Sequence, residues 1–234
     1  QGAVWDPTSQ QVLFVGADHI TNPDGHFLRY MGFVTYSAAT NTWINRWKGS
    51  LSSCAPAGGG EIAGLPSWVE FGVHHGYDFN AIDAVNGRLY TRHPYYSPYQ
   101  FMQYDIASNV WTTIPAPSAF GQCCGGNAYF PELGGLVAVH GSLAYLYDGS
   151  SWTQLTPSRL PMESQGIYRL FAEYNPVHKV VLFGGGNLTY NYVYKLDQNR
   201  QITQLAPAPG AIRLGTINAG SAKNGSIVTV DPVS

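Results

Sequence analysis

The sequence predicts an all-β protein, a β-propeller of four-stranded antiparallel blades, and three observations support this class. Of the 234 residues only 11% are charged and 14% are aromatic, while 27 are Gly and 15 are Pro. Short strands joined by tight turns have this composition. Paired apolar runs also recur along the chain, and an aromatic–turn–Trp element returns at a blade-like spacing. We expect about four and a half blades, which form an incomplete ring.

Each predicted blade begins with a β-hairpin. In these segments two apolar runs of alternating pattern flank a turn that contains Pro, Gly or Asn. The four first hairpins span residues 4–16, 81–91, 128–141 and 173–186. A fifth segment, 217–231, repeats the pattern near the end of the sequence.

A second hairpin follows each of the first four. These hairpins span residues 33–47, 101–115, 143–157 and 192–207, and the clearest is F-M-Q-Y-D-I-A-S-N-V-W-T-T-I-P at 101–115. Trp43, Trp111, Trp152 and Ile202 hold equivalent places, at spacings of 68, 41 and 50 residues. Four strands per 40 to 50 residues indicate propeller blades. A generic β-sandwich with accidental similarity is the alternative.

The repeats define a single partial propeller over residues 1–234. Its blades are expected at residues 2–49, 73–118, 122–158 and 166–209, with a half blade at 213–234. An open arc would leave two strand edges unpaired, which favours aggregation. We therefore expect further blades, supplied by the rest of a longer chain or by another subunit.

The repeated units resemble the kelch repeat. This resemblance rests on the run V-L-F-G-G at 181–185, which a strand with Tyr follows. In the other units the next strand has Trp. The first unit has Gly16-Ala17 and the third His140-Gly141 in place of the Gly-Gly pair. Residues 71–90 and 123–136 are also similar to uncharacterised bacterial secreted proteins with galactose-oxidase-type kelch propellers. The resemblance implies strands ordered a to d from the centre outwards and six or seven blades in a closed ring.

The strand directions place the variable connections on one end of the blades. The a–b and c–d turns share one end and are short, whereas the b–c and d–a connections share the other end. The long connections span residues 16–32, 48–72, 92–99, 118–126, 156–166 and 184–192. Variable loops on a rigid scaffold commonly carry function. The sequence therefore predicts that the functional face is the b–c/d–a end.

Aromatic and polar side chains in these connections are candidates for ligand contact. Tyrosines stack on sugar rings and donate hydrogen bonds, and they lie here beside Arg and Asn. The predicted ligand-binding residues are Arg92, His93, Tyr95, Tyr96, Tyr168, Arg169 and Asn187. Ordinary loop packing is the alternative interpretation.

Histidines in the same connections suggest a divalent metal site. Imidazole and carboxylate groups are common ligands, and the candidates are His19, His26, His75 and Asp78. His74 and His75 would point to opposite sides of a strand, so only one of the pair is a ligand if the strand has begun there. The alternatives are histidines that bond to backbone carbonyls, or ligand contact without a metal.

Three cysteines occur, and two of them are adjacent. A vicinal disulfide between Cys123 and Cys124 must span Cα atoms about 3.8 Å apart, which requires a strained turn. Flanking glycines, including Gly126, could absorb that strain. A bridge from Cys54 and buried thiols are the alternatives.

Composition points to an extracellular or cell-surface protein. With four lysines among 234 residues, the chain has no basic surface suited to nucleic acid, and no apolar run is long enough to span a membrane. Asn187 and Asn224 each begin an N-glycosylation sequon, which is compatible with secretion.

These observations favour an extracellular binding or assembly module whose loop face engages a glycan or a protein partner. One alternative is a secreted carbohydrate-active enzyme, either a hydrolase or lyase or the oxidase that the resemblance implies. Such an oxidase would hold copper with two histidines and two tyrosines. No pair of acids is singled out by spacing. The other alternative is a structural subunit of a surface fibre, and no cofactor is expected unless the metal site exists.

Overall fold

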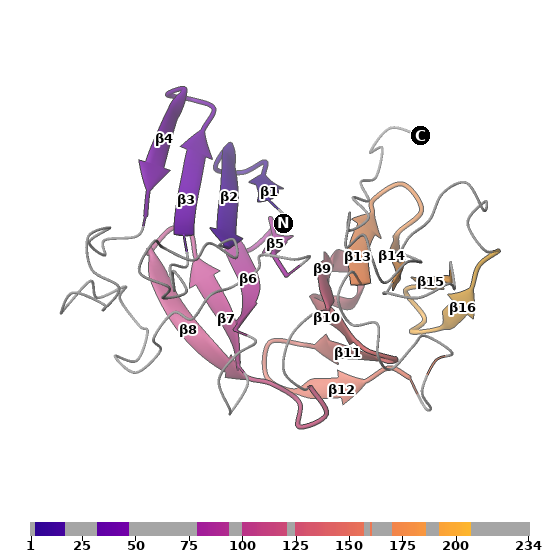
Figure 1. Ribbon diagram of the computed structural model, residues 1–234. Coiled ribbons are helices and arrows are strands. Elements are labelled where there is room, and N and C mark those ends of the chain that lie inside the picture. The colour runs from indigo at the N-terminus through magenta and orange to yellow at the C-terminus, as the bar shows by residue number, and fades with distance from the viewer. Residues whose placement is uncertain are drawn as a thin grey trace, which may run out of the picture. The chain divides into compact units, whose positions relative to one another are not determined.

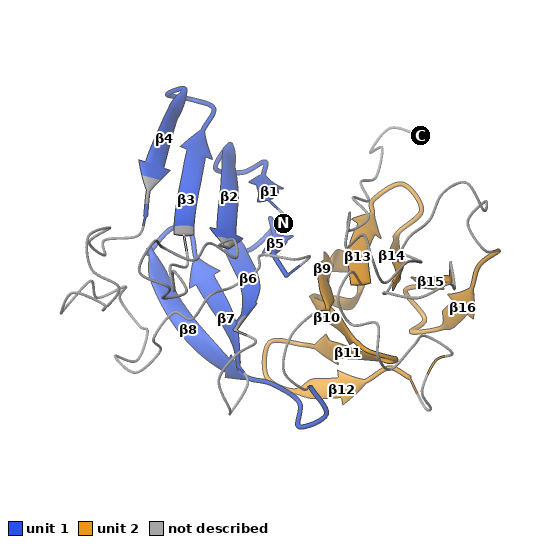
Figure 2. Ribbon diagram, in the orientation of Figure 1, with its two compact units in different colours: residues 1–122 blue, residues 123–234 orange. Residues whose placement is uncertain are grey.

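A computed structural model describes residues 3–16, 32–46, 79–93, 100–120, 125–156, 160, 170–185 and 192–206 (Figure 1). These residues form sixteen β-strands and one 3-10 helix, η1 (Pro131–Leu133). The predicted all-β class is confirmed. Contacts divide the chain into two compact units, residues 1–122 and 123–234 (Figure 2).

The first unit holds two four-stranded antiparallel sheets. Blade 1 comprises β1 (Ala3–Asp6), β2 (Gln11–Gly16), β3 (Gly32–Ser37) and β4 (Thr42–Asn45). Blade 2 comprises β5 (Ala81–Asp83), β6 (Arg88–His93), β7 (Gln100–Asp105) and β8 (Val110–Pro115). In each sheet the strands are paired in chain order.

The second unit repeats this topology. Blade 3 comprises β9 (Gly126–Phe130), β10 (Gly135–His140), β11 (Leu143–Tyr147) and β12 (Trp152–Gln154). Blade 4 comprises β13 (Leu170–Asn175), β14 (Val180–Gly185), β15 (Val193–Leu196) and β16 (Ile202–Gln204). All eight predicted hairpins of the four blades are present, and the predicted half blade at 213–234 lies outside the described residues.

The strand register confirms that the repeated Trp positions, and Ile202 in blade 4, are equivalent, as their spacing in the sequence predicts. Trp43 pairs with Tyr36, Trp111 with Tyr104, Trp152 with Tyr147, and Ile202 with Leu196. Cross-strand partners point to the same side of a sheet, so each blade has one face that carries this row. We name it the tryptophan face and name the other side the reverse face.

Within each unit the blades pack by the same rule. Leu13, Val15 and Phe33 on the reverse face of blade 1 form one core with Tyr104 and Trp111 on the tryptophan face of blade 2. The reverse face of blade 3 forms a second core with the tryptophan face of blade 4. Its buried members are Ala128, Phe130, Val137, Val139, Ala144 and Leu146 from blade 3, and Leu170, Ala172, Val181, Phe183, Tyr194 and Leu196 from blade 4.

The a–b and c–d turns share one backbone design. Each turn has a residue with a positive φ, and in six of the eight turns it stands immediately before the returning strand: Gln10, Asn41, Gly87, Asn109, Gly134 and Lys179. In the c–d turns of blades 3 and 4 it is Gly149 and Arg200, three and two residues before β12 and β16. Gly and Asn adopt this conformation readily, whereas long side chains are strained in it. The turn geometry is therefore imposed by strand pairing even where the sequence supplies Gln or Lys.

Glycine at these strained positions should stabilise the protein. Gln10 has φ 53° and Lys179 has φ 52°. We expect Gln10→Gly and Lys179→Gly each to raise the free energy of unfolding by about 0.5–1 kcal/mol, because relief of left-handed strain outweighs the greater entropy of the unfolded chain. Urea denaturation measures the change. The matched control is Gly87→Ala (φ 63°), which should lower stability by about 1 kcal/mol. A loss of stability in both glycine variants would contradict the prediction.

Candidate functional site

We name the end of the blades with the a–b and c–d turns the turn end, and the end with the b–c and d–a connections the loop end. At the turn end, hydrogen bonds within each turn fix its conformation. Aspartates at the ends of strands a and c accept hydrogen bonds from the turn that follows each strand. They are Asp6, Asp83, Asp105, Asp148 and Asp197, and Asn175 has the same role in blade 4. These side chains hold turns and do not form an acid pair suited to general acid–base chemistry.

Asp148 shows the effect on a carboxylate most clearly. Its Oδ1 accepts hydrogen bonds of 2.8 Å from the backbone N–H groups of both Ser150 and Ser151. These bonds, first that from Ser151 and then that from Ser150, lower the pKa of Asp148 to about 2. The side-chain hydrogen bond from Ser108 similarly lowers the pKa of Asp105. Both groups are fully ionised at neutral pH.

Stability should therefore depend on Asp148 at acid pH. The folded-state pKa of about 2 is below the ordinary value of 3.8, so the stabilising contribution is complete above pH 3.8. It is lost as the pH falls towards about 2. Asp148→Asn keeps an oxygen acceptor but does not titrate. Thermal melts across this window should show a smaller acid-induced fall in Tm for the variant than for the native chain, and parallel profiles would contradict the prediction.

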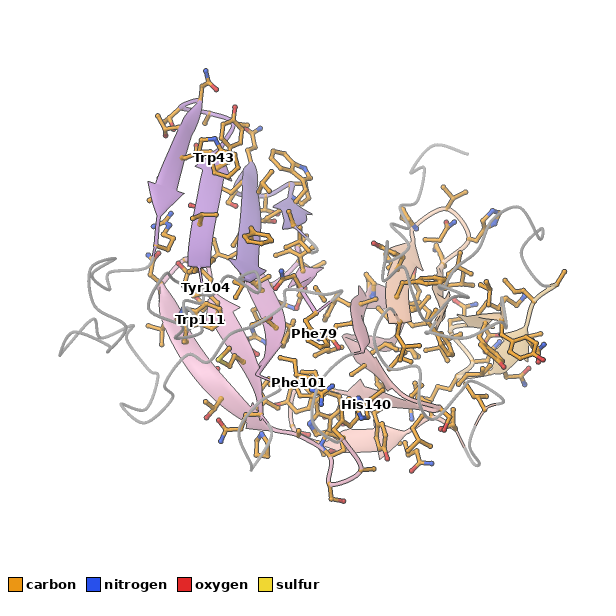
Figure 3. All side chains as sticks on the ribbon, in the orientation of Figure 1. Trp43, Phe79, Phe101, Tyr104, Trp111 and His140 are labelled. Atoms are coloured by element: carbon orange, nitrogen blue, oxygen red, sulfur yellow. The ribbon has the colours of Figure 1, made fainter. Side chains whose placement is uncertain are left out.

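At the loop end, Arg92 lies in an apolar enclosure. Arg92 is in β6, one residue before the strand ends, and its side chain is 1% exposed. Its Cζ lies 4.9 Å from the ring centroid of Phe120, 5.6 Å from that of Phe79 and 5.9 Å from that of Phe101. Figure 3 shows Phe79 and Phe101 near each other at the loop end of blade 2. A guanidinium contacts aromatic faces favourably at such distances.

Three segments of blade 2 build this enclosure, which we name the Arg92 cage. Phe79 precedes β5, Phe101 lies in β7 opposite Arg92, and Phe120 follows β8. Phe101 and Phe120 also make an edge contact with ring centroids 5.6 Å apart. The cage is tied to blade 1 because Asn80 Nδ2 donates to the Val15 carbonyl oxygen at 2.9 Å.

The chemical property of the cage is a permanent positive charge in apolar surroundings. Arginine stays protonated when buried, and its planar group matches a carboxylate or a phosphate. Low local polarity strengthens its interaction with any anion that approaches it. The described side chains of the cage, Arg92 and the three Phe rings, include no nucleophile and no proton acceptor.

The long-connection rule has an exception in blade 3. There β10 and β11 are joined by Gly141 and Ser142 alone, and Gly141 has φ 56°. Ser142 is buried, and its carbonyl oxygen accepts a hydrogen bond from the Leu160 N–H at 3.0 Å. The sequence prediction that b–c connections are long therefore does not hold for blade 3.

Most of the predicted site residues lie outside the described residues. They are His19, His26, Cys54, His75, Asp78, Tyr95, Tyr96, Cys123, Cys124, Tyr168, Arg169, Asn187 and Asn224. His93 ends β6, and its side chain is not among those described. Ligand contact, metal binding, the vicinal disulfide and glycosylation at these positions stay predictions. In the described part of the chain, no three His, Cys, Asp or Glu side chains are grouped as metal ligands would be.

Sequence reasoning selected Arg92 but missed the residues that surround it. Phe79 and Phe120 lie in polar, Gly-rich connections, where an isolated Phe gives no periodic pattern. The usable signal was an aromatic residue placed immediately beside a strand and a turn, as in F-N-A-I-D at 79–83. The described residues include no helix with the length and apolar character needed to cross a bilayer.

Comparisons with known proteins support the fold. No protein-family model matches the chain, and no curated protein matches its sequence. Among solved structures, the GH74 enzyme of Niastella koreensis matches with a TM-score of 0.54 at 16% identity, over 88% of this chain and 29% of that chain. A chain of the nidogen/laminin complex matches with a TM-score of 0.52 at 10% identity, over 88% of this chain and 63% of that chain.

TolB from Acinetobacter baumannii is also similar, with a TM-score of 0.50 at 12% identity over 88% of this chain and 43% of that chain. These three matches are to propeller proteins. The present chain spans less than two thirds of the length of each matched chain. At these identities the similarity defines the class of fold: the chain is built of β-propeller blades.

Proposed function

We propose that this protein is an extracellular or cell-surface binding or assembly module whose loop face engages a glycan or a protein partner. The observation that carries the proposal is the Arg92 cage, which lies at the b–c/d–a end of blade 2. The planar guanidinium group matches the geometry of a carboxylate or a phosphate. The cage therefore places a positive charge at the end of the blade where the connections are long and a partner with such a group would approach.

The difference between the two ends of the blades supports the same assignment. At the turn end the aspartates are engaged by their own turns, as for Asp148 with Ser150 and Ser151. The connections at the other end differ from blade to blade in sequence, and Arg92 lies one residue before the end of the strand that precedes one of them. Function that requires adaptable polar groups is therefore assigned to the loop end.

Binding is favoured over catalysis by the chemistry of the described acids. Besides the turn aspartates, Glu132 accepts a hydrogen bond from the Tyr174 hydroxyl at 3.0 Å. Burial and this bond raise the pKa of Tyr174 to about 12, so the Tyr stays protonated. A secreted carbohydrate-active enzyme, a kelch-type copper oxidase and a divalent metal site at His19, His26, His75 and Asp78 are the competing proposals.

The matched solved structures include a component of a protein complex and an enzyme, so they do not distinguish binding from catalysis. One matched chain belongs to a nidogen/laminin complex, and another is a GH74 enzyme. Similarity of 10–16% identity transfers the fold alone. The assignment to binding therefore rests on the residues of this chain.

A glycan array followed by titration calorimetry tests the proposal. We expect the full chain to bind acidic glycans, or an extracellular protein with an exposed acidic segment in a parallel array. Arg92→Met should weaken that binding at least about tenfold, because the interaction of a paired charge is lost. Arg92→Lys should retain part of it.

The control is Val85→Ser, at the turn end of the same blade, where the side chain is 81% exposed. This substitution should leave binding unchanged. Equal Tm values for Arg92→Met and the native chain would show that the fold is intact. Absence of binding on both arrays, or equal loss in Val85→Ser and Arg92→Met, would overturn the proposal.

A further inference from the structure

The a–b turn of blade 2 contains an asparagine that is followed by a glycine. Asn86 is exposed, and Gly87 has φ 63° with open space where a Cβ atom would lie. The turn residues Asn41 and Asn109 are followed instead by Thr and Val. Among the asparagines that the structure describes, Asn86 is therefore the one that precedes a glycine.

An Asn-Gly pair in an exposed turn has a specific reactivity. The Gly87 backbone nitrogen can lose its proton to hydroxide and form a C–N bond to Asn86 Cγ, and Asn86 Nδ2 then leaves as ammonia. Water adds to one of the two carbonyl carbons of the resulting succinimide ring and breaks a C–N bond of the ring, which gives aspartate or isoaspartate. Glycine favours the attack because it has no Cβ atom to obstruct formation of the ring.

We propose that Asn86 is a site of deamidation, with water as the co-reactant, and that Asp83 controls the rate. Asp83 Oδ2 accepts a hydrogen bond from Asn86 Nδ2 at 2.7 Å, and Asp83 Oδ1 accepts one from the Asn86 backbone N–H at 3.1 Å. The side-chain amide must leave Asp83 before Asn86 Cγ reaches the Gly87 nitrogen. This opening is local to an exposed turn, so it does not require the blade to unfold.

The products would disturb the turn in which they form. Deamidation replaces the Asn86 Nδ2 donor by a carboxylate oxygen opposite the Asp83 carboxylate, so a hydrogen bond becomes a repulsion between like charges. The isoaspartate product also lengthens the backbone by a carbon atom just before Gly87. In the native turn the Gly87 carbonyl oxygen accepts a hydrogen bond from the Ile106 N–H at 2.9 Å, and this added length would displace it.

A contact between blades 1 and 2 depends on the same turn. Thr8 Oγ1, in the a–b turn of blade 1, donates a hydrogen bond to the Ala84 carbonyl oxygen at 3.0 Å. Ala84 lies between Asp83 and Asn86, so distortion of the turn would weaken this contact. Deamidation should therefore lower the stability of the first unit with time. The inference does not involve the Arg92 cage and does not depend on ligand binding at the loop end.

Incubation of the full chain at mildly alkaline pH, followed by peptide mass spectrometry, tests the proposal. We expect the mass change of amide to acid to accumulate at Asn86, with both aspartate and isoaspartate present. Asn109 is the internal control, because it is exposed in the c–d turn of the same blade and Val110 follows it. It should stay unmodified over the same period. An unmodified Asn86, or equal modification of Asn86 and Asn109, would overturn the proposal.

Two further variants test the chemistry and its consequence. Gly87→Asn should lower the rate at Asn86 severalfold, since Asn adopts positive φ, as at Asn109 (φ 59°), but its Cβ atom obstructs the ring. In thermal melts Asn86→Asp should lower Tm more than Asn86→Gln, which adds no charge beside Asp83. An unchanged rate in Gly87→Asn, or equal Tm values for the two variants at position 86, would contradict the proposal.

The role of Asp83 has its own matched control. Asp83→Ser supplies a hydroxyl oxygen for the turn N–H groups but no second oxygen for Asn86 Nδ2, so the rate at Asn86 should rise severalfold. Asp105→Ser makes the same change in the c–d turn of blade 2, where Asp105 Oδ1 accepts from the Ser108 N–H at 2.8 Å. It should leave the rate at Asn86 unchanged. Equal acceleration in both variants, or none in Asp83→Ser, would show that Asp83 does not control the reaction.

Discussion

Trp111→Ala is expected to lower the free energy of unfolding of the first unit by about 3–5 kcal/mol. Trp111 is fully buried, and its ring lies 4.9 Å from that of Tyr104 and 5.3 Å from that of Phe33. Removal of the indole would leave a cavity between blades 1 and 2 and abolish both aromatic contacts. Urea denaturation followed by far-ultraviolet circular dichroism measures the change.

Two controls separate burial from residue type. Trp43→Ala removes the same side chain from the equivalent position of blade 1, where it is largely exposed, and should cost about 1 kcal/mol or less. Trp111→Phe should cost less than Trp111→Ala. The Trp111 indole nitrogen has no hydrogen-bond partner in the described part of the chain, so this change breaks no such bond. Equal losses for Trp43→Ala and Trp111→Ala would contradict the assignment of the inter-blade core.

The hairpins could be predicted because their signals are local. Alternation along a strand, a turn residue with a preference for positive φ, and a repeated Tyr–Trp pair all lie within fifteen residues of one another, as at 101–115. The exposure of the repeated tryptophans could not be predicted in this way. Whether Trp43 or Trp111 is covered depends on the neighbouring blade, and the two positions have the same local pattern.

The candidate site was less predictable for a related reason. Arg92 was assigned to a loop because a polar R-H-P sequence follows an apolar strand, yet β6 continues through it and places it under Phe120. Residues that surround a buried charge come from segments far apart in the sequence, here 79, 101 and 120. Turn-forming residues in the sequence mark the end of a strand only where pairing with the neighbouring strand does not continue past them.

Gly126 illustrates how a tertiary contact replaces a local explanation. In the sequence it stands beside Cys123 and Cys124, where a glycine is expected to accommodate a strained turn. In the structure it is the first residue of β9, and a Cβ atom there would lie 2.6 Å from the backbone N of Ala172 and 2.6 Å from the backbone C of Phe171. The glycine therefore allows β9 to approach β13 of the adjacent blade (Figure 1).

Gly126→Ala should consequently lower the free energy of unfolding of the second unit by about 2–3 kcal/mol, because a methyl group would force the innermost strands of blades 3 and 4 apart. Thermal and urea denaturation measure the loss. The matched control is Gly134→Ala: a Cβ there meets open space, and only the strain of φ 61° costs about 1 kcal/mol.

A double variant shows which atoms oppose the methyl group. The Ala172 Cβ lies 3.1 Å from the added Cβ, farther than the backbone atoms, so Ala172→Gly should not restore the stability of Gly126→Ala. Full rescue would mean that the side chain, and not the strand backbone, limits the approach. Failure of rescue together with a small effect of Gly134→Ala would establish that the spacing of β9 and β13 is set by backbone contact, which only glycine at position 126 permits.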